Sequence, residues 1–165
     1  MDIQIYQAFM KSPIGYWTCK TNENQVISIG FSKEQPLIEN PGNKLSKEVI
    51  SQLQAYFAKK LQNFDLPLHI EPYSAFYQQV WGALLIVKYG QTSTYSILAQ
   101  KINNPKAVRA VGLANGRNPF PIVIPCHRII GKDNSLTGYA SGIDVKRWLL
   151  EHEGAIGKQA SLFQL

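Results

Sequence analysis

The sequence predicts an α/β protein of the α+β type, with an antiparallel sheet and its covering helix first and a mostly helical part second. Short segments rich in β-branched and aromatic residues, separated by turn residues, fill the first 31 positions. Apolar residues at helical spacing dominate from residue 74 onward. With 165 residues, 45% of them hydrophobic, the chain is long enough to bury a core. We therefore expect two domains, residues 1–72 and 74–165.

The first domain is expected to form a meander of three strands and one helix. The strands are predicted over residues 3–10, 16–20 and 26–31, with turns at 12–15 and 22–24. Helical spacing of apolar residues predicts one helix over residues 47–61, and residues 66–70 are a further strand candidate. No titratable side chains cluster in this domain, and Cys19 lies in an apolar strand. We assign Cys19 a structural role and the domain no chemistry.

The second domain carries a helix–turn–helix pattern. A helix is predicted over residues 76–90, followed by a short helix that ends at residue 102 and for which Thr92, Ser93 and Thr94 offer hydroxyl N-caps. Asn104-Pro105 then predicts the start of a helix over residues 106–116. Two short helices joined by a tight turn are typical of a helix–turn–helix.

The second of these helices has small side chains apart from one arginine. Gly112 lies in its interior, at a helix-propensity cost of about 1 kcal/mol. Small side chains allow a close approach, either to a DNA groove, where Lys106 or Arg109 would reach the strand, or to a neighbouring helix. Packing against a helix does not by itself explain Arg109.

The charge is uneven along the chain. Residues 1–74 hold seven Lys and seven Asp or Glu, whereas residues 75–165 hold ten Lys or Arg and four Asp or Glu. The net charge of +6 therefore lies in the second domain. This asymmetry points to a polyanionic partner, nucleic acid or an acidic surface, and an ordinary solvated basic face is the alternative that charge alone leaves open.

Cysteine and histidine are too few for a disulfide framework or a metal site. There are two cysteines, without paired spacing, and three scattered histidines. No signal sequence or membrane-spanning apolar run is present. We expect a reducing, cytoplasmic location in which a free thiol persists.

Cys126 is the candidate nucleophile. It lies between Pro125 and His127, in a stretch where residues 122–124 and 129–130 are expected to be buried and extended. His127 and Arg128 are residues that lower a thiol pKa, so we expect the pKa of Cys126 to lie below the roughly 8.5 of free cysteine. The alternative is a buried small hydrophobe beside a hydrogen-bonded histidine.

The last expected elements are a loop and a helix. Residues 136–142 form a glycine-punctuated loop around Tyr139, and a helix is predicted over residues 143–153, ended by Gly154. The tail from Ala155 is expected to be weakly ordered.

Four blocks of this domain match a known family in order and spacing. RAVGLANGRNP (109–119), IPCHRIIG (124–131), LTGYASG (136–142) and KRWLLEHEG (146–154) resemble the O6-alkylguanine-DNA alkyltransferases, also called methylated-DNA–protein-cysteine methyltransferases. The resemblance spans residues 74–154 and implies a ribonuclease H-like first domain and a winged helix-turn-helix-like second domain.

The resemblance implies a single, irreversible reaction without a cofactor. Cys126 would attack the alkyl carbon on O6 of guanine and keep it as a thioether. His127 matches the family's base, acting through a water, and Glu153 matches the carboxylate that orients it. Tyr95 matches the tyrosine that promotes base flipping and donates to the guanine ring, and Lys146 aligns with a lysine near the thiol.

The resemblance also implies the DNA contacts. Arg109 matches the finger that replaces the extruded nucleotide in the stack. Asn118 matches the hinge between the groove helix and the cysteine segment, while Tyr139 and the Ala140 backbone match the pocket wall and the O6 contact. The remaining expected DNA-binding residues are Thr94, Lys106, Ala107, Val108, Ala110 and Gly112, and the remaining expected pocket residues are Pro121 and Ser141.

The expected partner is double-stranded DNA containing O6-alkylguanine, bound by a monomer, with cooperative binding along DNA left open. No membrane partner is expected. Ala140 and Ser141 depart from the serine and glycine that relatives often carry, which leaves the tolerance for bulky alkyl groups open. The zinc that some relatives bind has no ligand set here.

Two other functions fit parts of the pattern. Cys126, His127 and Glu153 also form a hydrolytic constellation, which would turn over repeatedly. A non-catalytic module that binds alkylated DNA is the second alternative, although such modules in this family lack the cysteine.

Overall fold

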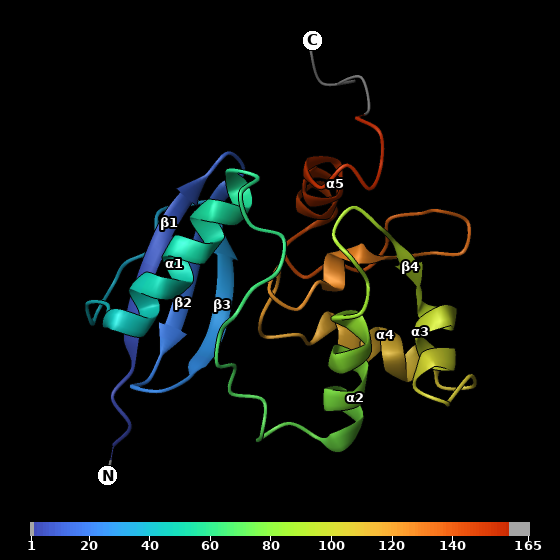
Figure 1. Ribbon diagram of the computed structural model, residues 1–165, viewed down its shortest axis with the longest axis horizontal. Helices are drawn as coiled ribbons and strands as arrows, with labels where there is room; N and C mark the ends of the chain where they lie inside the picture. Colours follow the sequence, from blue (N-terminus) through green and yellow to red (C-terminus); the bar gives the residue numbers. More distant parts are fainter. Residues whose placement is uncertain (1, 159–165) are drawn as a thin grey trace.

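The computed structural model describes residues 2–158 and has the expected α+β architecture (Figure 1). Strands β1 (Tyr6–Ser12), β2 (Gly15–Thr21) and β3 (Val26–Ser32) form an antiparallel sheet in the order β1-β2-β3. Helix α1 (Lys44–Phe57) covers one face of this sheet. The meander is confirmed, with the β1–β2 hairpin closing between Ser12 and Gly15.

Helix α1 ends earlier than predicted. It begins at Lys44, where the Asn43 side chain accepts from the Ser46 N–H, and its spaced apolar residues Val49 and Leu53 are fully buried. The helix stops at Phe57 instead of continuing to residue 61, because the chain turns through a left-handed conformation at Lys59 (φ 58°).

The predicted strand over residues 66–70 is wrong. Its contact with the sheet is an isolated bridge between Val26 and Leu68, with hydrogen bonds from Val26 N–H to the Pro67 carbonyl and from His69 N–H to the Val26 carbonyl. Pro67 has no N–H to donate, so it interrupts a strand ladder in the middle of this short segment.

The rest of the described chain is mostly helical, and Figure 1 shows helices α2 to α4 on the opposite side of the molecule from the sheet. The elements, in order, are α2 (Ala75–Leu84), β4 (Ser93–Thr94), α3 (Tyr95–Lys101), α4 (Val108–Gly116), the 3₁₀ turn η1 (Cys126–Arg128), β5 (Ile129–Ile130) and α5 (Ile143–His152). Thr94 caps α3 as predicted, accepting from the Ile97 N–H. The helix–turn–helix is confirmed by the packing of α3 against α4.

Two helix boundaries differ from the prediction. Helix α2 ends at Leu84 instead of residue 90, because the Ile86 and Val87 N–H groups donate to carbonyls three residues back and turn the chain. Helix α4 begins at Val108 instead of residue 106. Asn104 lies in a separate turn, where its carbonyl accepts from Ala107, and no side chain caps α4.

The segment before Cys126 was expected to be extended, and this is wrong for residues 122–124. Ile122 has a positive φ of 71°, and the Ile124 N–H donates to the Phe120 carbonyl, so the chain makes a buried turn. The Asn118 side chain holds this turn by donating to the Ile124 carbonyl at 2.7 Å and accepting from Phe120 at 2.9 Å. Residues 129–130 are extended as predicted and pair with β4 in parallel.

The end of the described chain agrees with the predicted helix. Helix α5 buries Val145 and Leu149, Trp148 is partly buried, and Gly154 follows with a φ of 73°. The weakly ordered tail predicted from Ala155 falls mostly outside the described residues. No helix within residues 2–158 is long and apolar enough to cross a membrane.

Replacing Leu53 by alanine should destabilise the protein, because Leu53 is fully buried between α1 and the sheet. We expect the free energy of unfolding to fall by about 2–5 kcal/mol, measured by urea denaturation. Leu37→Ala, at a side chain that is 93% exposed, is the matched control and should change it by less than about 0.5 kcal/mol. Equal losses for the two variants would contradict this assignment of the core.

Candidate active site

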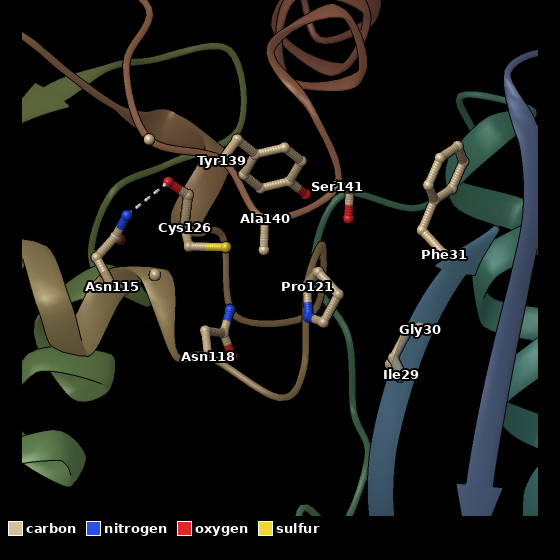
Figure 2. A pocket seen from close by; sticks show the side chains of 12 residues that line it. Ile29, Gly30, Phe31, Asn115, Asn118, Pro121, Cys126, Tyr139, Ala140 and Ser141 are labelled. Carbon is tan, nitrogen blue, oxygen red and sulfur yellow. Dashed lines mark hydrogen bonds between the residues drawn. The ribbon is translucent and has the colours of Figure 1, made fainter. Parts of the chain in front are cut away.

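Cys126 lies at the first residue of η1 and lines a cavity of about 230 Å³ (Figure 2). The residue is 4% exposed. The walls come from four parts of the chain: β3, the end of α4, the turn before Cys126 and the loop before α5. They comprise Ile29, Gly30, Phe31, Asn115, Gly116, Asn118, Pro121, Gly138, Tyr139, Ala140 and Ser141. The cavity therefore gathers all five of the predicted pocket and hinge residues around one sulfur atom.

The expected low thiol pKa is wrong for this arrangement. Burial raises the pKa of Cys126 above its ordinary value, and the Asn118 side chain and the Lys146 charge offset this in part. Arg128, expected to lower it, instead donates to Glu153 and to the Val87 carbonyl. Arg128 thus pairs with Glu153 and not with the sulfur, and burial keeps the resting thiol protonated.

His127 and Glu153 meet as the resemblance implied. His127 Nε2 lies 2.7 Å from Glu153 Oε1, and both side chains are fully buried. Burial lowers the pKa of His127, so the imidazole is neutral. Because Glu153 is ionised, Nε2 carries the proton and donates it, which leaves Nδ1 as a proton acceptor. Within the described residues, Nδ1 has no hydrogen-bond partner.

Glu153 receives four hydrogen bonds. Besides His127, Arg128 donates from Nε to Oε2 at 2.9 Å and from Nη2 to Oε1 at 3.0 Å, and the Tyr56 hydroxyl donates to Oε1 at 2.8 Å. Burial alone would raise its pKa, but the hydrogen bonds and charges of His127 and Arg128 hold the pKa of Glu153 at about 2. Sequence reasoning missed Tyr56, whose spacing in α1 marked it as a core residue, and the ion pair of Arg128.

Lys146 is fully buried in α5. Its Nζ donates to the carbonyls of Ile129 and Thr137. Burial lowers the pKa of Lys146 to about 8, and a thiolate at Cys126 would raise it. Lys146 therefore ties the strand after the cysteine to the loop before α5, and its charge acts on the thiol.

A second, wider hollow adjoins the cysteine cavity. It has a volume of about 530 Å³ and shares Gly116, Gly138, Tyr139 and Ala140 with the first cavity. Its other walls are Tyr95, Gly112, Leu113 and Arg117. The Tyr95 hydroxyl donates to the Thr137 carbonyl at 3.2 Å. The two cavities thus meet at the four shared residues, with Tyr95 lining the outer one and Cys126 the inner one.

Helix α4 packs with one face and exposes the other. Val111, Ala114 and Asn115 are buried, and the Trp81 indole donates to the Ala114 carbonyl at 2.9 Å. Of the predicted DNA-binding residues, Lys106, Arg109 and Ala110 are exposed, while Thr94, Ala107, Val108 and Gly112 are partly buried. Packing against neighbouring helices is confirmed for the buried side of α4, and the approach to a DNA groove stays a prediction for its exposed side, which carries Arg109.

Six further wall residues, among them Asn115 and Phe31, were not predicted as pocket residues. Asn115, 1% exposed, donates weakly from Nδ2 to the Cys126 carbonyl at 3.4 Å. Phe31 reaches the cavity from β3, in the first part of the chain. Asn115 lies within the matched block 109–119 but was given no role, whereas Phe31 lies far from the cysteine in sequence, so no local pattern could have indicated it.

Iodoacetamide should alkylate Cys126 with a midpoint above that of free cysteine, since burial raises the pKa of the thiol. The measurement uses Cys19→Ser, which leaves Cys126 as the reacting thiol. Cys126→Ser in the same background reports any labelling elsewhere. A midpoint at pH 8 or lower would show that the sulfur is activated at rest and would overturn the assignment.

Two family models together match most of the chain. The model described as 6-O-methylguanine DNA methyltransferase, ribonuclease-like domain, matches residues 5–70, and the one described as 6-O-methylguanine DNA methyltransferase, DNA binding domain, matches residues 75–155. The methylated-DNA–protein-cysteine methyltransferase of Methanosarcina acetivorans is 45% identical over 92% of this chain and 99% of its own length. That of Haemophilus influenzae is 41% identical over 90% and 86%.

Solved structures give the same result. A crystal structure of Mycobacterium tuberculosis OGT in complex with DNA superposes with a TM-score of 0.80 at 39% identity, over 91% of this chain and 93% of that one. A Methanococcus jannaschii O6-methylguanine DNA methyltransferase superposes with a TM-score of 0.65 at 26% identity, over 96% and 99%. The chain belongs to the methylated-DNA–protein-cysteine methyltransferase family.

Proposed function

We propose that this protein repairs double-stranded DNA by moving the alkyl group of an O6-alkylguanine onto Sγ of its own Cys126, once and irreversibly. Its family transfers alkyl groups from DNA to a protein cysteine. The assignment to Cys126 rests on the cavity, which contains this thiol and adjoins the hollow beside α4.

The thiol is protonated at rest and is deprotonated for the reaction by His127. Neutral His127 presents Nδ1 as a base, and a water between Nδ1 and Sγ carries the proton, because the two side chains do not bond directly. The imidazolium that forms is stabilised by the buried charge of Glu153. The thiolate then attacks the alkyl carbon, the C–S bond forms as the C–O bond breaks, and the electron pair leaves on O6.

Guanine leaves as an anion that needs hydrogen bonds. Tyr95 lines the hollow through which the base would enter, and its hydroxyl is placed to donate to the ring as the charge develops. Ala140 and Ser141 line the cysteine cavity, where a backbone N–H would contact O6. The thioether has no leaving group that water could displace, so Cys126 is consumed.

The base must leave the helical stack, because O6 is inaccessible inside a duplex. Helix α4 offers small, exposed side chains that fit a groove, and Arg109 projects from the same face to fill the vacated place. Lys106 and the Thr94 turn would contact the backbone. Asn118 would hold the turn before Cys126 in a fixed position relative to α4.

We further propose that the protein acts as a monomer in the cytoplasm and that its two parts, residues 1–72 and 74–165, are separate domains. The second carries the net positive charge and the DNA-binding face. The first supplies wall and support residues to the site.

Incubation with an O6-methylguanine duplex should add one methyl group to Cys126 and to no other residue. Intact-mass and peptide analysis measure the gain, which should stop at one equivalent because the thioether is stable. Cys126→Ala should bind the duplex and remain unmodified. Product formation beyond one equivalent would identify a hydrolase, and binding by the wild type without methylation would identify a recognition module.

Arg109→Ala should slow transfer from duplex DNA by about 10- to 100-fold, because the extruded base loses the group that fills its place. Transfer from free O6-methylguanine base, which needs no flipping, should be unchanged. Lys60→Ala, which removes an exposed charge far from α4, is the control. An equal loss with both substrates would show that Arg109 supports the fold instead.

A further inference from the structure

The catalytic carboxylate has a partner from the other part of the chain. Tyr56 is the last-turn residue of α1, is fully buried and donates to Glu153 Oε1 at 2.8 Å. The same oxygen accepts from His127 Nε2 at 2.7 Å. The hydroxyl and the imidazole therefore share one acceptor atom, although 71 positions separate Tyr56 from His127 in the sequence.

The position of Tyr56 is fixed independently of this bond. Its carbonyl accepts from His152 Nε2 at 3.1 Å, and its ring lies 5.3 Å from the His152 ring and 6.1 Å from the Tyr89 ring. Phe57, beside it, packs against Trp148 of α5. These contacts hold α1 against α5, so the Tyr56 hydroxyl is kept in a fixed orientation towards Glu153.

We infer that Tyr56 is a positioning residue for alkyl transfer, whose hydroxyl fixes the carboxylate oxygen that orients His127 and offsets part of that oxygen's charge. The inference rests on the proposed function and gives the first part of the chain a role in it. Arg128 already balances the carboxylate charge through two hydrogen bonds. The hydroxyl therefore adjusts how strongly Oε1 attracts the His127 proton.

The direction of the effect follows from this geometry. Without the hydroxyl, Oε1 would carry more negative charge towards His127 and would favour the imidazolium, so the pKa of His127 would rise. The other charged or titratable groups that face this cluster among the described residues are Arg128, Tyr89, Tyr139, His152, Lys146 and Cys126. None of them is altered by Tyr56→Phe. The base would then be protonated, and the site inactive, over a wider acidic range.

The test is the pH profile of single-turnover methyl transfer from an O6-methylguanine duplex at saturating DNA. Tyr56→Phe should move the acid limb up by about one pH unit and leave the plateau within about twofold of wild type. Tyr89→Phe is the matched control, since it removes a neighbouring tyrosine hydroxyl with no hydrogen bond to Glu153 among the described residues. Tyr89→Phe should leave the acid limb of the pH profile unchanged.

A merely structural role for Tyr56 predicts a different result. It would lower the rate equally at all pH values, or lower stability alone, and either outcome would overturn the inference. In a Glu153→Gln background, Tyr56→Phe should have no further effect on the profile, because the hydroxyl acts through the carboxylate. An independent effect there would also overturn it.

NMR titration of the His127 imidazole gives a readout without DNA. Its midpoint should rise in Tyr56→Phe, and it should fall when 3-fluorotyrosine, a stronger donor of similar shape, replaces Tyr56. The fluorinated protein decides the question if Tyr56→Phe does not fold. Absence of methyl transfer by wild type would overturn the proposed function, whereas an unmoved His127 midpoint would overturn the inference about Tyr56.

Discussion

The buried carboxylate of Glu153 is the interaction on which the rest of the structure depends. A carboxylate without water is stable only when other donors and charges compensate it, and here Arg128, His127 and Tyr56 supply four hydrogen bonds. The charge lies at the C-terminal end of α5, where the helix dipole disfavours it, so Arg128 is needed there as well. Loss of any one of these partners would leave part of the buried Glu153 charge without compensation.

This network links the sheet part of the molecule to the reactive cysteine. Tyr56 contributes the hydroxyl from α1, and β3 contributes Phe31 to the cavity wall. The resting thiol stays protonated because it is buried, while its base is held neutral by the same burial. For a protein that can react once, a thiol of low resting reactivity avoids consumption by other electrophiles, since the thiolate is the nucleophilic form.

Much of the fold could be predicted from local pattern. Alternation and turns gave the three strands, and the Thr94 cap and the spacing of Val145 and Leu149 gave α3 and α5. The predictions failed where a side chain outside the segment forms hydrogen bonds with its backbone. Residues 122–124 have β-branched side chains typical of strands, but the Asn118 side chain and Pro121 impose a buried turn on them.

The sequence by itself determined the chemistry: a thiol, an imidazole and a carboxylate in the motifs of one family, with a basic helix upstream. Side-chain identity and spacing are local properties, so they can be read without coordinates. The tertiary structure decided the electrostatics. Burial raised the pKa of Cys126 despite its cationic neighbours in sequence, directed Arg128 to Glu153 and brought Tyr56 to the same oxygen as His127. Desolvation and long-range contacts depend on the packed fold, and adjacency along the chain does not specify them.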